Sequence, residues 1–102
     1  MQQHRFEVGD VIVGVVDGRP TIRGECDLSN AAEIGRWLAY FGIMPIDVDL
    51  SGVTFFGAAA LRALLDAADR NPYLRVVEPS PVVQRVLEIT HTYAVLVDGQ
   101  RP

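Results

Sequence analysis

The chain has 102 residues, enough for one ordinary domain, and 49% of them are apolar, enough for a core. Its formal net charge is −4 with both signs dispersed, so the sequence carries no basic stripe for nucleic acid. No apolar run approaches the roughly 20 residues of a membrane span, and residues 1–5 lack the apolar region of a signal peptide. We therefore expect one domain, 1–102, that is soluble and cytoplasmic without membrane insertion.

A β-hairpin is the first predicted unit. Residues 11–16 are apolar and β-branched, which is typical of a strand. Asp17-Gly18 suits the positive φ angles of a two-residue turn, and residues 19–24 return as a second strand. Because Pro20 cannot donate a ladder hydrogen bond, we expect the second strand to lie near a sheet edge there.

A helix and a half-buried strand follow the hairpin. The helix begins after Asn30, the expected N-cap, with Glu33 as its capping-box partner, and runs to about residue 41. Gly42 fits the position just past its end. Residues 46–50 alternate apolar and acidic side chains, which favours a strand, and we expect it to be central in the sheet. The apolar helix face holds Ile34, Trp37, Leu38 and Phe41.

The second helix is predicted over residues 58–70. Its exposed face carries Arg62, Asp66 and Arg70 at i, i+4 spacing, so we expect ion pairs there. Pro72 ends the helix, and residues 74–77 form a short strand. The buried stripe consists of Leu61, Leu64, Leu65 and Ala68.

A third helix begins with Ser80 as N-cap and Pro81 at its first position. Residues 94–97 read as a last strand, and 98–102 as a tail. A hairpin followed by three helix–strand pairs predicts an α/β fold, with a mixed sheet and helices packed mainly on one side. The inner face of the third helix holds Val83, Val86, Leu87 and Thr90.

Few residues suggest catalysis. His4, His91 and the single Cys26 lack the spacing of a zinc site, and no phosphate-cradling glycine-rich motif is present. A Cys–His nucleophile pair stays open, because such partners meet only in space. We expect no enzymatic activity, no cofactor and no metal. Four aspartates are expected to be solvated or to cap turns: Asp17, Asp27, Asp47 and Asp49.

Cys26 has two interpretations. In the first, it fills a buried position at a strand end as a small apolar residue. In the second, it is an exposed thiol whose intermolecular disulfide gates partner binding. The first is favoured, because reactivity needs exposure and a lowered pKa.

Three segments resemble the STAS domain, the module of anti-sigma factor antagonists. Residues 49–56 read D-L-S-G-V-T-F-F and residues 61–65 read L-R-A-L-L, two parts of the family's signature loop. Residues 24–30 resemble G-E-L-D-L-[AS]-[TN], with Cys26 where Leu is usual, and residues 80–87 resemble S-P-x-V-x-R-V-L. The resemblance covers nearly the whole chain and implies a STAS fold. All nine basic residues are arginine, which hints at a GC-rich bacterial gene.

The family's phosphorylatable serine is missing. Where the family has D-S-S-G, residues 57–60 read G-A-A-A. Ala58 stands at the phosphorylation position without a hydroxyl, and Gly57 has no capping oxygen, although glycine is a tolerated N-cap. One interpretation is plain degeneration into good helix formers. The other is a surface that binds a partner without phosphate control, with the backbone N–H groups of Ala59 and Ala60 available to a carboxylate or anion.

The resemblance implies a non-enzymatic regulator of transcription, typically in stress responses. Its partner would be an anti-sigma factor, a serine kinase of the GHKL ATPase type, and occupying it would free a sigma factor by mass action. One alternative is the STAS subunit of a lipid-transport ATP-binding-cassette system. Another is a scaffold that pairs with other STAS proteins or with itself. The expected docking face comprises Gly24, Glu25, Cys26, Asp27, Leu28, Thr54, Phe55, Phe56, Gly57, Ala58, Ala59, Ala60 and Arg62.

Overall fold

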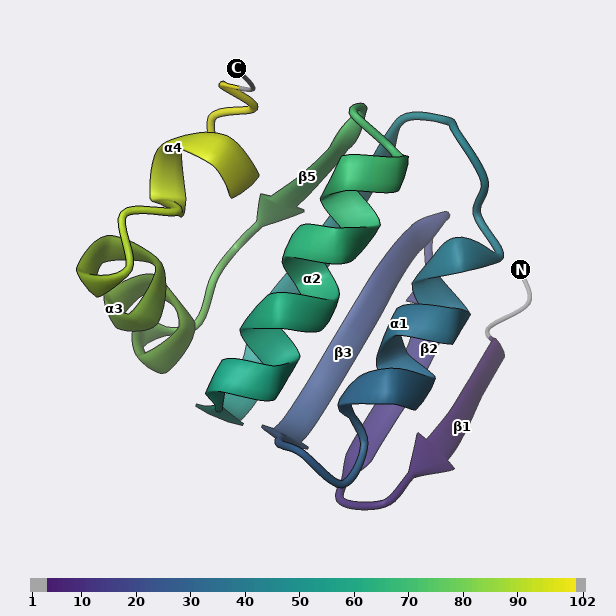
Figure 1. Ribbon diagram of the computed structural model, residues 1–102. Coiled ribbons are helices and arrows are strands. Elements are labelled where there is room, and N and C mark those ends of the chain that lie inside the picture. The colour runs from purple at the N-terminus through teal and green to yellow at the C-terminus, as the bar shows by residue number, and fades with distance from the viewer. Residues whose placement is uncertain (1–3, 101–102) are drawn as a thin grey trace.

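Within residues 4–100, five strands form one mixed sheet in the order β1-β2-β3-β4-β5 (Figure 1). The computed structural model describes residues 4–100, with side chains from residue 7. Strands β1, β2 and β3 pair antiparallel, and β4 runs parallel to both β3 and β5. The predicted mixed sheet with an N-terminal hairpin is thus confirmed. The strands span β1 (His4–Val8), β2 (Val11–Val16), β3 (Arg19–Cys26), β4 (Ile46–Phe56) and β5 (Leu74–Val77).

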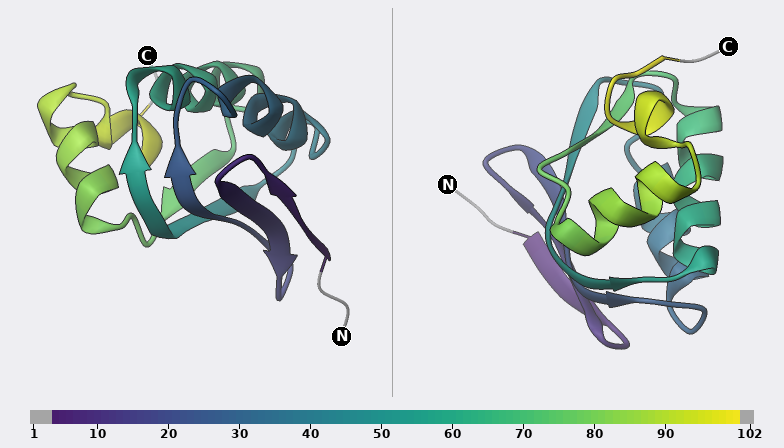
Figure 2. Two further views of the ribbon diagram at one scale, coloured as in Figure 1. Left: turned by 90° about the horizontal axis from the view of Figure 1, so that it is seen from below. Right: turned by 90° about the vertical axis from the view of Figure 1, so that its left-hand side faces the viewer.

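Two helices, α1 (Ala31–Ala39) and α2 (Ala58–Arg70), lie side by side on one face of the sheet (Figures 1 and 2). Helices α3 (Pro81–Ile89) and α4 (Tyr93–Leu96) lie beyond the β5 edge. Strand β5 pairs only with residues 46–49 of β4, and α3 packs beside the rest of β4. The backbone N–H of Ser80 donates to the carbonyl of Leu50 at 3.2 Å, which fixes the start of α3 against the strand.

The core lies between the sheet and the helices. Val13, Val48 and Val76 are fully buried on three strands, which places them under α1 and α2. The only tryptophan, Trp37, is buried at the far end of α1 and packs edge-on against Phe41, with ring centroids 5.3 Å apart. No helix within residues 4–100 has the length and apolarity needed to cross a membrane.

The hairpin turn and most of the helix ends agree with the predictions made from the sequence. Asp17 and Gly18 both have positive φ, as predicted. Helix α2 covers the predicted range, and Ser80 caps α3 by accepting from the N–H of Val83 at 3.3 Å. Helix α1 ends at Ala39, two residues earlier than predicted. Thr90 is exposed, and it is not part of the inner face because its hydroxyl donates to the carbonyl of Val86 at 2.7 Å.

The sequence predicted too few residues in strands at β1 and β4. Strand β1 was not predicted, and β4 continues six residues past Leu50, through a stretch that read as a loop. Gly52 allows this continuation, because a Cβ there would lie 2.8 Å from Cγ of Arg23 on the neighbouring strand. Strand β3 is the middle strand of the sheet, but it has a free edge at Pro20, as predicted for that residue. Pro20 is tolerated because it precedes Thr21, the first residue paired with β4.

The predicted last strand, 94–97, is wrong, and that segment forms the short helix α4. His91 takes a positive φ of 59°, and the N–H of Thr92 donates to the carbonyl of Leu87, so the chain turns back on α3. Tyr93, Leu96 and Val97 then fall at i, i+3 and i+4, a helical spacing that fully buries Leu96. A run of four apolar residues fits a strand and a buried helical turn equally well, so the pattern alone does not distinguish the two structures.

Candidate functional site

The two loops that the sequence singled out meet at one edge of the sheet. Strands β3 and β4 are parallel, so their carboxyl ends lie together, with Cys26 paired to Phe56. The N–H of Gly57 donates to the carbonyl of Cys26 at 2.9 Å and ties the start of α2 to the end of β3. Residues 24–28 and 54–62 are thereby brought side by side. In open α/β sheets, binding sites lie at such carboxyl ends.

Asn30 shapes the loop between β3 and α1. It is the N-cap residue of α1, but its side chain makes no capping hydrogen bond, so the predicted capping box with Glu33 is wrong. Its Oδ1 instead accepts from the N–H of Asp27 at 3.0 Å, and its Nδ2 donates to the carbonyl of Glu25 at 2.9 Å. The buried amide thus bridges the loop from within. Asp27 adds a local turn, accepting from the N–H and the hydroxyl of Ser29.

Gly24 is required where β3 bends toward the loop. Its φ is +107°, and a Cβ there would lie 2.3 Å from the carbonyl oxygen of Asp10. The close approach allows the N–H of Glu25 to donate to that oxygen at 3.2 Å. Only glycine fits this position, because any larger residue would push the β3 end away from the β1–β2 turn.

The predicted docking face divides into exposed and buried residues. Leu28 is 84% exposed and Phe55 is 49% exposed, so each strand end presents a large apolar side chain to solvent. Large exposed apolar side chains supply contact area in protein interfaces. The exposed members of the face are Glu25, Leu28, Thr54, Phe55, Ala58 and Arg62, and the half-buried ones are Gly24, Asp27, Gly57 and Ala59.

Three members of the predicted face have buried side chains, namely Cys26, Phe56 and Ala60. They support the face from beneath, and their side chains do not contact a partner in this conformation. Phe56 was expected at the surface because residues 51–57 were interpreted as a loop, whereas alternate residues of β4 point inward.

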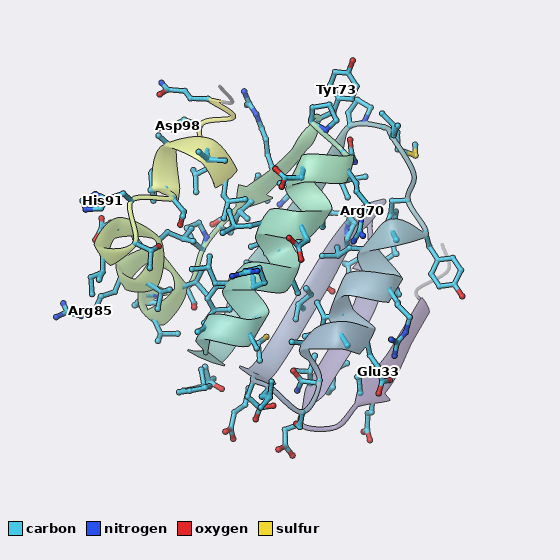
Figure 3. All side chains as sticks on the ribbon, viewed as in Figure 1. Glu33, Arg70, Tyr73, Arg85, His91 and Asp98 are labelled. Atoms are coloured by element: carbon cyan, nitrogen blue, oxygen red, sulfur yellow. The ribbon has the colours of Figure 1, made fainter. Side chains whose placement is uncertain are left out.

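Cys26 is buried, as the first of its two interpretations states. Burial, with a smaller effect of the Asp27 charge, raises the pKa of its thiol to about 12. The thiol therefore stays protonated near neutral pH and is a poor nucleophile. His91 is exposed on the far side of α3 (Figure 3), and no hydrogen bond joins it to Cys26 within the described part of the chain. The side chain of His4 lies outside the described residues.

The N-terminus of α2 has no side-chain cap. Gly57 is the N-cap, and its carbonyl accepts from the N–H of Leu61 at 3.0 Å. Ala58 is exposed, so the family's phosphorylation position is accessible but has no hydroxyl. The nearest hydroxyls along the chain, on Ser51 and Thr54, are exposed on strand β4.

A polar hollow lies away from the docking edge. Within residues 4–100, no three His, Cys, Asp or Glu side chains gather closely enough to hold a metal ion. A hollow of about 880 Å³ lies on residues of β2, β3 and β4, on the sheet face that α1 and α2 leave open. Arg19 and Asp49 face each other there with Nη1 and Oδ2 4.0 Å apart. The lining of this hollow includes no residue of 24–28 or 54–62, so it is separate from the docking edge described above.

Comparison with known proteins identifies the fold. No protein-family model matches the sequence. An anti-sigma factor antagonist from Mycobacterium paratuberculosis has a similar structure, with a TM-score of 0.68 and 19% sequence identity over 93% of this chain and 83% of that chain. The chain has the fold of an anti-sigma factor antagonist. The STAS fold that the sequence resemblance implied is thus confirmed, and the loops at the carboxyl ends of β3 and β4 become the candidate docking edge.

Proposed function

We propose that this protein is a regulator that binds an anti-sigma factor through the edge formed by residues 24–28 and 54–62. Its fold, shared with an anti-sigma factor antagonist, is the observation that carries the proposal. The exposed side chains of Leu28 and Phe55 support it, because they supply apolar contact area at the carboxyl ends of two parallel strands. The partner is a serine kinase of the GHKL type, and binding it releases a sigma factor in the bacterial cytoplasm.

Phosphate does not control this docking edge. A phosphate adds close to two negative charges and repels or remodels a docked partner. Residues 57–60 offer no hydroxyl to receive one, so ATP leaves the complex intact. The regulator then acts whenever it is present, and its concentration sets the free sigma factor.

Capture from the native cell tests the partner. The tagged protein should retain a kinase-fold anti-sigma factor, and Leu28→Ser should lose most of it. Tyr73→Ser is the matched control, because Tyr73 is also an exposed large side chain but lies at the opposite end of the sheet (Figure 3). Recovery of a transporter ATPase would refute the proposal, and so would equal loss with both variants. Recovery of another STAS protein alone would favour a scaffold.

Intact mass after incubation with the captured kinase and ATP tests the missing switch. The natural chain should gain no phosphate, whereas Ala58→Ser should gain one, because position 58 is exposed and serine needs little more room. Adding Gly57→Asp restores the family pattern at the cost of moving Phe55, whose Cε2 would lie 3.2 Å from the new Cβ. A phosphate on Ser51 or Thr54 in the natural chain would show that the acceptor had moved along β4.

A further inference from the structure

A second surface continues from the docking edge. A groove of about 440 Å³ runs between α1 and α2, beginning at the exposed Leu28. Small residues line it from both helices, among them Ala32, Gly35, Ala59 and Ala63. A Cβ added to Gly35 would lie 3.7 Å from Cβ of Ala63, so α1 and α2 approach each other closely beneath the groove. The outer surfaces of α1 and α2 therefore form a shallow channel with a floor of methyl groups and backbone.

The groove is basic, although the protein is acidic. Arg36, Arg62 and Arg70 line it together with one carboxylate, Asp66, which gives a local charge of +2 on a chain whose net charge is −4. The i, i+4 ion pairs predicted along α2 do not form: within residues 4–100, no carboxylate oxygen lies within 4.0 Å of these three guanidinium groups. Arg70 lies between the two helices (Figure 3). Three unpaired cations beside a smooth apolar floor fit an anionic partner.

The shape of the groove favours an α-helix as its occupant. The lining residues recur every three to four positions along both helices, over residues 31–39 of α1 and 59–70 of α2. At 1.5 Å per residue, these segments are roughly 12 and 17 Å long, which is two to three turns. Small side chains permit close approach of a helix backbone, and among the described side chains no aromatic ring lines the groove to stack a nucleic-acid base.

We propose that the groove between α1 and α2 binds an acidic amphipathic helix of a partner protein. A stripe of alanine and leucine lies on the floor, and glutamates at its edges pair with Arg36, Arg62 and Arg70. The proposal rests on the proposed function only in that the partner is a protein. It adds a second contact, continuous with Leu28, that recognises the partner by charge and not through the α2 N-terminus.

The test uses a defined probe and does not depend on the captured kinase. A stapled helical peptide of roughly 15 residues, with a leucine–alanine stripe flanked by glutamates, is titrated into the isotope-labelled protein. We expect saturable shifts at the amides of Ala32, Gly35 and Ala63, and affinity that falls as salt rises. The same peptide with lysine in place of each glutamate should bind at least about tenfold more weakly.

Two charge reversals separate a local effect from a global one. Arg36→Glu should weaken the glutamate peptide at least about tenfold, whereas Arg85→Glu changes net charge equally and should have an effect of about twofold or less. Arg85 is exposed on α3, away from the groove (Figure 3). Ala32→Phe, at an exposed groove position, should block binding by filling the channel. Its folding is checked by the fluorescence of Trp37.

Several outcomes would overturn the proposal. They are equal binding of the lysine peptide, shifts confined to other surfaces, equal effects of the two reversals, or groove shifts produced by anionic phosphatidylserine vesicles but not by the peptide. Failure here leaves the proposed function standing if Leu28→Ser still loses the captured kinase. Conversely, peptide binding in the groove with no kinase captured would refute the proposed function and leave the groove proposal standing.

Discussion

Replacing Asn30 by aspartate distinguishes two roles of its side chain, capping α1 and bridging the loop between β3 and α1. Asparagine and aspartate are about equally good N-caps, so a capping residue would tolerate the exchange. The structure instead uses both ends of the amide, with Oδ1 accepting from Asp27 and Nδ2 donating to the carbonyl of Glu25. Aspartate keeps the first hydrogen bond but faces that carbonyl, 2.9 Å away, with a second oxygen. Asn30→Asp should therefore destabilise the fold at neutral pH.

The expected cost follows from the two contacts. Losing one hydrogen bond at a buried side chain costs about 1 kcal/mol, and setting a buried carboxylate against a carbonyl adds a comparable penalty. The total of about 2 kcal/mol lowers the melting temperature of a domain of this size by roughly 8 °C or more. Asn30→Ala removes both hydrogen bonds and should cost about 2–3 kcal/mol.

Urea unfolding followed by Trp37 fluorescence measures these costs. Trp37 is the only tryptophan and is buried in α1, so its emission reports the transition. Ala32→Asp is the control, because it adds the same charge in the first turn of α1, where a carboxylate is mildly favourable. The loss of stability caused by Asn30→Asp should also become smaller at acidic pH. Repulsion raises the pKa of the new carboxyl, and the protonated form, present below that pKa, donates to Glu25. A variant within about 0.5 kcal/mol of the natural chain at pH 7 would refute the bridging role.

Three further outcomes are expected. Asn71→Asp should cost a similar amount, because buried Asn71 donates from Nδ2 to the carbonyl of Met44 at 2.7 Å and accepts from the N–H of Tyr73; melting temperatures check it. Leu96→Ala should cost about 2–5 kcal/mol in urea unfolding, because α4 fully buries that side chain; a cost below 1 kcal/mol would contradict its packing. Between pH 8 and 10 the natural chain should lose about 1.4 kcal/mol more stability than Cys26→Ala, because the unfolded thiol ionises near pH 9 while the folded thiol stays protonated up to about pH 12; parallel stability curves would show that the thiol is not buried.

The fold was predictable wherever the apolar period was long. Helix α2 was placed to the residue, because its stripe repeats over 13 positions between a glycine and a proline signal. Errors came from short or ambiguous patterns. The continuation of β4 past Leu50 was missed, because the role of Gly52, making room for Arg23 on β3, depends on a contact between strands that no local pattern reveals. Four apolar residues at 94–97 fitted two structures, and the turn at His91 decided between them.

The docking edge was predictable from resemblance, but its internal support was not. The sequence singled out the two loops that the sheet brings together, because both carry motifs of the resembled family, and partner binding by these loops stays a prediction. It could not show that Asn30 bridges its loop, since an amide at a helix start is most often a cap and only the loop path puts Glu25 and Asp27 within its reach. The basic groove was missed for a similar reason. Arginines four residues from an aspartate suggest ion pairs, and only the packing of α1 beside α2 turns them toward a common channel.

The contacts that hold the docking edge in place are separate from the side chains that it exposes to a partner. The edge is held by groups that face inward: the carbonyl of Cys26 accepts from Gly57, the amide of Asn30 spans its loop, and Phe56 is buried beneath. None of these contacts uses the side chain of an exposed residue at the edge, such as Leu28, Phe55 or Ala58. Loss of a hydroxyl at position 58 therefore leaves the scaffold intact, because Gly57 anchors the start of α2 through its own backbone. A chain with this arrangement can lose phosphate control and keep its partner surface, which is the condition that the proposed function requires.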